Sequence, residues 1–582
     1  MGILNYFSWL IRHFEKRIIT KTLPYRFPHQ LYLDFNCAIH PVAKSHPEIT
    51  IEQMCDHIIK YLDYLINYVK PTDLIYLAID GVAPVAKMKQ QRLRRFKSIK
   101  EAREMAQLKQ QFGVTTIPSP EMTKDFNMIS PATEFMSILS HKIETFFVSF
   151  RSKHPIEIIF SDSSVPSEGE HKILQYIKTQ PLEKKCVIYG LDSDLIMLSM
   201  SSGRENIALV RETLFLKTGN NIDVLVDQYP QLDYFLIDPL KQILYQILVG
   251  HQPIGDHAIL HEELVDETNP INFNKKSVIQ DYIVMSFLLG NDFVPPIMTM
   301  QIKHHGIEKM IQAYRNVLHQ FNGSRYLTGA RPGSLNQDFL IQLLKILSTT
   351  EESELIQQKE NHDRYLKMYD YAKDPQTFEE ALEQYQKVEH LFQDEIDPGH
   401  LGWQDRYYCH YFRLNPEDPC HRRIQIYKLC QEVFRAYQWI TRYYLDQCPD
   451  WFWSYPHEVT PLLSDLVTFL EQEPDFLDQL QFVQHQPVPP FWQLLMILPP
   501  QSAPLVPTPY RWYMTSKWSP LVSYFPCDVE LDYDGKRYRY EAHPILPLID
   551  PLSLFKHVGH LDSFLSEEER QRGSIGKIKT WK

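Results

Sequence analysis

Two pairs of acidic residues stand close together in this chain, each beside a short apolar run. Glu168 and Glu170 open the segment EGEHKILQYI, and Asp192 and Asp194 follow directly after the β-rich run CVIYG. Carboxylates that converge at the ends of neighbouring strands repel one another strongly unless a positive charge lies between them. Hard divalent cations such as Mg²⁺ prefer carboxylate and water oxygens as ligands. The two pairs together predict a divalent-metal site.

A simpler interpretation exists for each pair taken alone. Ser167 and Glu170 have the spacing of a capping box, in which both side chains bond to the first turn of a helix. Either aspartate of the second pair has the side chain that caps the helix after it. Further acids at other strand ends would favour the metal site over two separate caps.

Such acids follow two more buried strands and one apolar helix. The run LYLD ends at Asp34, the run LIYLAID ends at Asp80, and the segment between them has helical periodicity over residues 51–69. Strand, helix and strand with acids at the carboxyl ends is the pattern of a parallel sheet whose site lies at that edge. The segment 281–293 reads as an apolar helix that is stopped by Gly290, with Asp292 just beyond. We therefore expect an α/β fold with a mostly parallel central sheet and helices on both faces.

A long basic helix is predicted shortly after Asp80. Residues 87–100 contain seven basic residues and no acid. Four polar side chains fall on one face at helical spacing: Lys87, Gln91, Arg94 and Arg95. A charge run of this kind is usually a solvated helix face. Beside an acidic metal site, however, it suits an anionic substrate that contacts both, and a phosphate ester is the obvious case.

Composition narrows the class of protein. The chain has 582 residues, 44% of them hydrophobic and 13% aromatic, which is ample for a large core. It has no apolar run long enough to cross a membrane, and its first residues lack a signal-peptide cleavage site. Its eight cysteines form no C-x-x-C pair. The net charge of −12 excludes a generally basic surface but not a local basic patch. We expect an intracellular protein that does not bind membranes.

Three regions differ in composition. Residues 1–350 carry the acids and the basic helix and are the predicted α/β core. Residues 351–400, rich in Glu, Gln, Asp and Lys, are a predicted helical connector. Residues 401–582 are dense in tyrosine and tryptophan and are expected to form a second module that wraps the core. Most of these aromatic side chains must serve packing, while one or two are candidates for stacking on nucleobases.

Read in order, these motifs resemble the XRN-type 5′→3′ exoribonuclease family, whose core is a PIN/FEN-like nuclease fold. The resemblance rests on six motifs in the first half: MGILNYFSWL, LDFNCAIH, LAIDGVAPVAKMKQQRLRRFKS, VPSEGEHKILQYI, YGLDSDLIML and FLLGNDFVPP. WFWSYP, PFWQLLMILP and LSEEERQRGSIG resemble the family's second conserved region. The likeness extends almost from end to end, and the motifs are long and ordered.

The resemblance implies roles for individual residues. The metal-binding and catalytic acids would be Asp34, Asp80, Glu168, Glu170, Asp192, Asp194 and Asp292. The pocket for the 5′-phosphate would comprise Lys87, Gln91, Arg94 and Arg95. His40 would stack on the leading bases opposite an aromatic partner, which matches Trp453, with Trp451 as the alternative.

The chain also departs from the family pattern. Leu4 stands where a proline is usual, and Cys37 and Ser167 stand where glycines are usual. None of these changes removes a predicted ligand. The zinc-knuckle cysteines of nuclear members and the additional C-terminal domains of the large cytoplasmic members have no counterpart. The resemblance therefore favours a compact member acting in the cytoplasm rather than the nucleus, in the host cytoplasm if the chain is viral.

The implied activity is processive removal of 5′-mononucleotides from single-stranded RNA with a 5′-monophosphate, by hydrolysis with two Mg²⁺ ions that Mn²⁺ can replace. Such an enzyme would degrade decapped or cleaved RNA, and the sequence indicates no obligate protein partner. Two alternatives stay open: a structure-specific 5′ nuclease acting on DNA flaps, and a non-catalytic RNA-binding protein. The presence of all seven acids argues against the second, because a binding protein has no need of their mutual repulsion.

Overall fold

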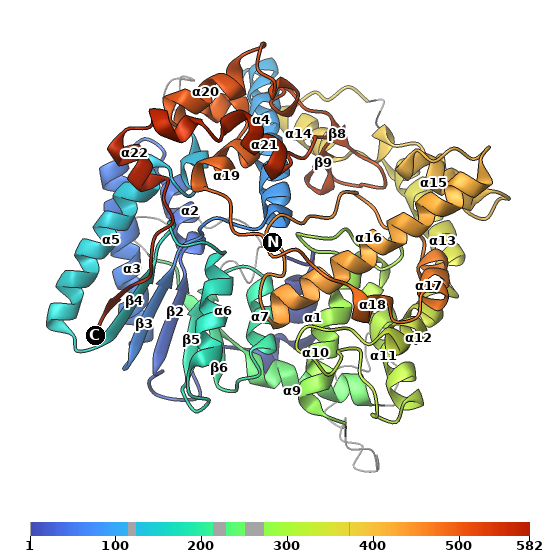
Figure 1. The fold of residues 1–582 in the computed structure, drawn as a ribbon, viewed down its shortest axis with the longest axis horizontal. Coiled ribbons are helices and arrows are strands. Elements are labelled where there is room, and N and C mark those ends of the chain that lie inside the picture. The colour runs from blue at the N-terminus through green and yellow to red at the C-terminus, as the bar shows by residue number, and fades with distance from the viewer. Residues whose placement is uncertain (1, 115–123, 214–228, 251–272, 370, 372) are drawn as a thin grey trace.

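A twisted β-sheet forms the left-hand part of the molecule in Figure 1. This computed structural model describes residues 2–114, 124–213, 229–250, 273–369, 371 and 373–582. Within these residues the main sheet has eight strands in the order β1-β7-β6-β5-β2-β3-β4-β10. Their bounds, in that order, are Ile19–Thr20, Leu232–Leu236, Ile207–Glu212, Cys186–Tyr189, Gln30–Asp34, Leu74–Ala78, Glu157–Ser161 and Lys579–Trp581.

The five inner strands, from β6 to β4, run parallel to one another. The chain builds β2, β3 and β4 in one direction and then returns to add β5 and β6 on the other side of β2. The strand order therefore reverses between β2 and β5, and ligands of open α/β sheets bind at the carboxyl ends of the strands at such a point. Antiparallel strands complete both edges, and one of them, β10, comes from the last residues of the chain. The predicted α/β class is confirmed.

Successive side chains of each strand point to opposite faces of the sheet, so the core lies on both faces. In β2, Leu31 and Leu33 pack with helices α2 (Asn36–Ser45), α3 (Ile51–Val69) and α5 (Glu134–Lys153). Tyr32 points to the opposite face, which is covered by the helices listed here: α1 (Tyr6–Ile18), α6 (Gly169–Thr179), α7 (Asp194–Ser201), α9 (Ile237–Val249) and α10 (Lys275–Met285). Buried on both faces, the inner strands read as continuous apolar runs.

The core on the α6 side continues into the second half of the chain. It includes side chains of α11 (Gly306–Gln320), α12 (Gln337–Ser348), α16 (Pro419–Leu445) and α17 (Leu463–Gln472). The predicted connector forms α13 (Glu351–Met368) and α14 (Phe378–Gln386). The first half thus shares an apolar core with α16 and α17 of the aromatic-rich region. The three domain boundaries stay a prediction. No helix among the described residues has the length and apolar character needed to span a bilayer.

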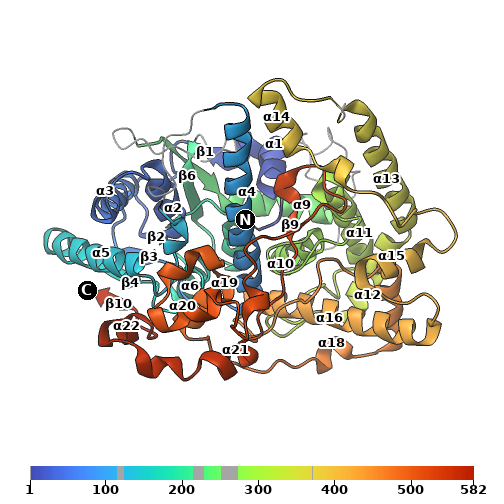
Figure 2. The ribbon, with the colours of Figure 1, turned by 90° about the horizontal axis from the view of Figure 1, so that it is seen from above.

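Helix α4 (Val85–Gln111) is the predicted basic helix, and it stands between the sheet and the helical half (Figure 2). It begins against α19 (Pro490–Ile497), where the amide of Ala83 donates to Oε1 of Gln493 at 2.8 Å. Arg92 is buried and donates to the carbonyl of Met496 at 3.2 Å. Segments from the second half therefore enclose α4, and much of its charge serves these contacts.

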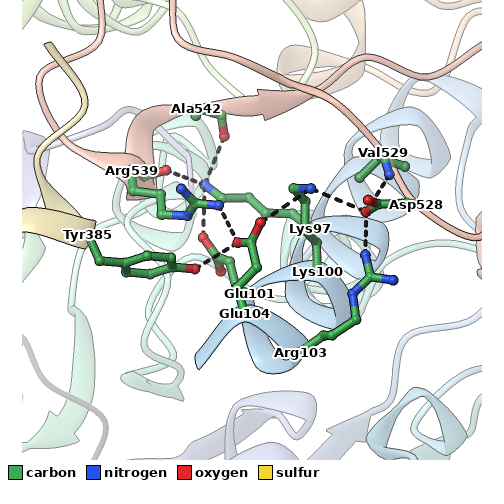
Figure 3. Close-up of polar contacts among 10 residues, drawn as sticks. All are labelled: Lys97, Lys100, Glu101, Arg103, Glu104, Tyr385, Asp528, Val529, Arg539 and Ala542. Carbon is green, nitrogen blue, oxygen red and sulfur yellow. Dashed lines mark hydrogen bonds and ion pairs between the residues drawn. The ribbon is translucent and has the colours of Figure 1, made fainter. Parts of the chain in front are cut away.

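The outer half of α4 is fixed by a network of polar contacts, drawn in Figure 3. The ammonium of Lys97 donates to three backbone carbonyls, those of Arg539, Tyr540 and Ala542, at 3.0, 2.8 and 2.8 Å. Glu104 accepts a hydrogen bond from Tyr385 at 2.9 Å and pairs with the Arg539 guanidinium. These contacts join α4, α14 and the segment that leads into β9 (His543–Pro544).

We expect Lys97→Met to destabilise the protein and to leave the arrangement of the acidic residues unchanged. The methionine keeps the aliphatic stem but removes the ammonium that donates to three carbonyls, of which that of Arg539 keeps the amide of Ala542, at a cost of about 2 kcal/mol in the free energy of unfolding. Urea unfolding of the variant measures this loss. Lys60→Met, at an exposed position of α3, is the matched control and should lie within about 0.5 kcal/mol of the wild type. Equal effects of the two substitutions would contradict this role for Lys97.

Candidate active site

Six of the seven predicted acids lie at or just after the carboxyl ends of β2, β3, β4 and β5. Asp34 is the last residue of β2, and Asp80 follows β3 by two residues. Glu168 and Glu170 lie at the start of α6, Asp192 follows β5, and Asp194 begins α7. The seventh acid, Asp292, follows the 3₁₀ turn η4 (Ser286–Leu289) at the end of α10. Parallel strands bring four distant segments to one edge of the sheet, and α10 adds the fifth.

Backbone and side-chain contacts fix Asp80 beside the start of α6, and Asp34 lies close to the same helix start. The amide of Gly169 donates to Oδ1 of Asp80 at 2.7 Å, and Nδ2 of Asn36 donates to Oδ2 of the same carboxylate at 2.9 Å. A Cβ at position 169 would lie 2.6 Å from Oδ1 of Asp34. A side chain at position 169 would therefore force the Asp34 carboxylate to shift, so glycine favours this close approach of the helix start to the aspartates.

Lys87, at the start of α4, is a counter-ion for this cluster. Its ammonium lies 2.7 Å from Oε2 of Glu168 and 2.9 Å from Oδ2 of Asp292. Burial alone would lower the pKa of Lys87, but Asp292 and Glu168 raise it well above its usual value. Lys87 thus stays charged, and the structure places this predicted phosphate ligand among the acids.

One ammonium does not balance the acids around it. Burial, reinforced by Asp80 and Asp192, raises the pKa of Asp34 well above its usual range. Burial and the charge of Asp194 do the same for Glu170. The pKa of Asp194 rises to about 7, through burial and the nearby Asp292. Without further positive charge, several of these carboxyls therefore favour the protonated form.

The donor set fits a divalent cation. Oε2 of Glu170 is buried and has no hydrogen-bond partner among the residues described. Glu168, Glu170 and His171 each offer a ligand atom, and these atoms lie within 4.8 Å of one another. A buried carboxylate oxygen without a donor is costly unless a cation takes its lone pairs. Carboxylates in this number suit Mg²⁺ or Mn²⁺.

The other predicted phosphate ligands lie further along α4, away from the acids. Arg94 is exposed and makes no ion pair with any residue that the structure describes. Arg95 is half-buried and donates to Oγ of Ser130 at 2.7 Å. Burial and the adjacent Arg94 lower the pKa of Arg95 to about 9. Gln91 is buried, and its Oε1 has no partner in the described part of the chain. Two neighbouring cations with unused donors are suited to binding an anion.

The five remaining basic residues between 87 and 100 are engaged elsewhere. Lys87 pairs with the acids, Arg92 and Lys97 bind backbone carbonyls of the second half, and Lys89 donates to the carbonyl of Tyr455 at 3.0 Å. Lys100 pairs with Asp528 at 3.2 Å. Arg94 and Arg95 thus differ from the other basic residues of this segment, because neither pairs with a described acid or donates to a described backbone carbonyl.

The two predicted base-stacking residues come from opposite halves of the chain. His40, on α2, is half-buried; burial first, then Arg94 and Lys44, lower its pKa to about 3, so the ring is neutral. Trp453 is half-buried and stacks on Trp439, with ring centroids 5.2 Å apart and planes 29° apart. The ring contact described for Trp453 is with Trp439, and none is described between His40 and Trp453. The alternative, Trp451, uses its carbonyl to accept from the amide of Val85 at 2.9 Å.

Comparison with known proteins places this site in a family. The family model for the XRN 5′-3′ exonuclease N-terminus matches residues 1–213, and that for the Xrn1 helical domain matches residues 272–388 and 358–578. Together they cover most of the chain. The chain belongs to the XRN family.

Relatives in this family match this chain almost from end to end. The 5′-3′ exoribonuclease 2 of Gallus gallus is 27% identical over 99% of this chain and 72% of its own length. The 5′-3′ exoribonuclease 1 of Homo sapiens is 27% identical over 98% of this chain but only 35% of its own length. That of Schizosaccharomyces pombe is 26% identical over 99% of this chain and 50% of its own length. This XRN-family chain therefore matches between 35% and 72% of the length of these three relatives.

Two departures from the XRN pattern lie in the site itself. Ser167 has φ of +96°, a conformation that glycine adopts at no steric cost, so the serine is strained there. Its amide donates to the carbonyl of Val82 at 2.8 Å, which helps to hold the strained turn before α6. The thiol of Cys37 lies 3.3 Å from Oδ2 of Asp34, to which it donates. Both changes leave the acids in place.

Sequence reasoning missed three residues of this XRN site. Tyr443, on α16, donates to Oε1 of Glu168 at 2.7 Å. His171 stacks on the Tyr443 ring, and Lys172 is buried with its ammonium bound to the carbonyls of Ile79 and Asp162. The two α6 residues directly follow EGE, so their helical position could have suggested them. Tyr443 had no such signal, because it lies in an aromatic-rich stretch 275 residues from Glu168.

Proposed function

We propose that this XRN-family protein is a processive 5′→3′ exoribonuclease that hydrolyses single-stranded RNA bearing a 5′-monophosphate to 5′-mononucleotides, as in RNA degradation after decapping or cleavage. Its seven acids would hold two Mg²⁺ ions, which Mn²⁺ can replace, and no protein partner is required. The names of its relatives support the reaction class. The observation that carries the finer assignment is the arginine pair of α4, which makes no ion pair with a described acid and lies on the same helix as Lys87, the counter-ion of the carboxylate cluster.

Helix α4 would set the cleavage position. Lys87 contacts the acids, and Arg94 lies seven residues later on the same helix, about 10 Å along its axis. Gln91, Arg94 and Arg95, together with Lys87 at the acid end of the helix, would hold the terminal phosphate, so that a rigid element fixes the distance from this phosphate to the acids. Positioning of this kind removes much of the entropic part of the barrier. A cap or a triphosphate would be too large for a pocket that fits one phosphate.

The acids contribute by holding the catalytic cations. A bound pair of divalent ions supplies Lewis acidity, which lowers the pKa of a water and stabilises the departing 3′-oxygen. Glu168, Glu170 and His171 offer three ligand atoms within 4.8 Å of one another. Lys87 balances part of the negative charge, and Asn36 and Gly169 fix the orientation of Asp80.

Digestion of matched substrates tests the proposal. RNA and DNA of one sequence are prepared with a 5′-monophosphate, a 5′-hydroxyl or a 5′-triphosphate, and the products are separated by chromatography. We expect 5′-mononucleotides from monophosphorylated RNA alone, and none in EDTA. Cleavage of a DNA flap with RNA left intact would instead support the structure-specific nuclease. Binding of RNA without any product in Mg²⁺ or Mn²⁺ would support the non-catalytic protein.

Trp453→Ala should shorten the run of cleavages per encounter on every RNA about equally. Loss of one base stack, worth about 1–3 kcal/mol, corresponds to roughly 5- to 150-fold faster release if all of it affects dissociation. A trap of excess unlabelled RNA, added after the reaction starts, measures the run length. Trp451→Ala is the matched control. If only the Trp451 variant shortens the run, Trp451 is the stacking residue; if neither does, both tryptophans serve packing.

A further inference from the structure

The second half of the chain contributes one hydroxyl directly to the acidic cluster. The phenol of Tyr443 donates to Oε1 of Glu168 at 2.7 Å, while Oε2 of the same carboxylate pairs with Lys87 at 2.7 Å. Tyr443 is buried on α16, and Glu168 is buried immediately before α6. The two oxygens of Glu168 thus have different partners, which fixes the rotation of the carboxylate about its terminal bond.

Three aromatic rings hold the Tyr443 ring in place. His171 stacks on it with centroids 3.8 Å apart and planes 30° apart, and Trp439 stacks on it at 4.9 Å and 27°. Phe293 meets it edge-on at 5.4 Å and 76°. His171 directly follows Glu170, and Phe293 directly follows Asp292. The ring is therefore packed against the segments that carry two further acids, and it has little freedom to turn.

We propose that Tyr443 is a positioning residue for metal binding: its hydroxyl orients Glu168, and the ring column His171–Tyr443–Trp439 fixes that hydroxyl. This inference rests on the proposed function, in which Glu168 is a metal ligand. Partners that orient a ligating carboxylate often change metal affinity or activity by 10- to 100-fold when removed. Tyr443 does not contact substrate in this role; it acts through Glu168.

The same column connects the acidic cluster to Trp453, the predicted base-stacking residue of the second half. Trp439 stacks on Trp453 at 5.2 Å, and its indole N–H donates to the carbonyl of Asp450 at 2.9 Å. The predicted base-stacking residue and the hydroxyl on Glu168 are therefore supported by the same buried tryptophan. The aromatic density of residues 437–455 serves the metal centre as well as the packing of α16.

Tyr443→Phe tests the inference, because it removes the hydroxyl and keeps the ring. Tyr437→Phe is the matched control on the same helix, since the Tyr437 hydroxyl is buried without a partner among the described residues. Mn²⁺ binding to the full chain, free of RNA, is measured by calorimetric titration. We expect the Mn²⁺ Kd of Tyr443→Phe to rise about 10- to 100-fold and that of Tyr437→Phe to stay unchanged. For Tyr443→Phe, kcat at fixed low Mn²⁺ should fall, KM for RNA should hold, and saturating Mn²⁺ should restore part of the activity.

A folded Tyr443→Phe protein that binds Mn²⁺ like the wild type would overturn the inference. So would equal losses in both tyrosine variants, because they would indicate a general effect of hydroxyl removal from α16. Glu168→Gln separates this failure from failure of the proposed function. If Glu168→Gln also leaves Mn²⁺ binding intact, Glu168 is not a ligand and the proposed metal site itself is wrong.

Discussion

We expect the double variant Asp192→Ala/Asp194→Ala to bind 5′-phosphorylated RNA and to leave it uncut. Loss of the metal contribution removes several kcal/mol of transition-state stabilisation, which corresponds to a rate at least about a thousandfold lower. RNA should bind as tightly as to the wild type or more tightly, because two carboxylates no longer repel its phosphates. Single-turnover cleavage and filter binding measure the two quantities on one preparation.

The conservative variant Asp192→Asn/Asp194→Asn controls for packing. Asp194 is buried, so truncation to alanine opens space in the site, whereas asparagine keeps the size and removes only the charge. Both double variants should be inactive and should bind RNA as tightly as the wild type or more tightly. Retained turnover in either one would overturn the two-metal assignment, and lost RNA binding in both would indicate that the acids instead shape the RNA-binding surface.

The position of the acids follows from sequence because strand and helix order determine it. A residue that ends a parallel strand must lie at the carboxyl edge, so Asp34, Asp80 and Asp192 converge once the strands are recognised. Helix α3 has the predicted bounds, Ile51–Val69, because local sequence signals define it. Its apolar face has a clear helical period, and Thr50 and Gln53 form a capping box at its start.

The roles of the basic residues in α4 could not be assigned in this way. The sequence shows seven cations within residues 87–100, but only the tertiary structure shows that Lys89, Arg92, Lys97 and Lys100 bind groups of the second half. Likewise, Lys87 is at phosphate-pocket spacing in the sequence and pairs with Glu168 and Asp292 in the fold. Contacts between distant segments decide which charges stay free, and local periodicity carries no information about them.

Substitution of Arg94 and Arg95 tests most directly how the protein recognises the 5′ end of RNA. We expect Arg94→Ala/Arg95→Ala to remove the preference for a 5′-monophosphate over a 5′-hydroxyl. Each charge-assisted hydrogen bond to the phosphate is worth about 1.5–3 kcal/mol, so two of them give at least roughly 100-fold discrimination. The ratio of kcat/KM for the two RNAs should fall by this factor towards one, through slower cleavage of the phosphorylated RNA alone.

The matched control removes the same charge from the same helix. Lys100 and Arg103 both pair with Asp528 at the outer end of α4 (Figure 3), so Lys100→Ala/Arg103→Ala lowers the charge of α4 equally, away from the acids. This variant should keep the end preference. The single variant Arg94→Ala guards against misfolding, because Arg94 is exposed and leaves the Arg95–Ser130 hydrogen bond intact. If the control loses the preference and the Arg94/Arg95 variant keeps it, the phosphate binds along the outer half of α4, and Arg94 and Arg95 form only a solvated face.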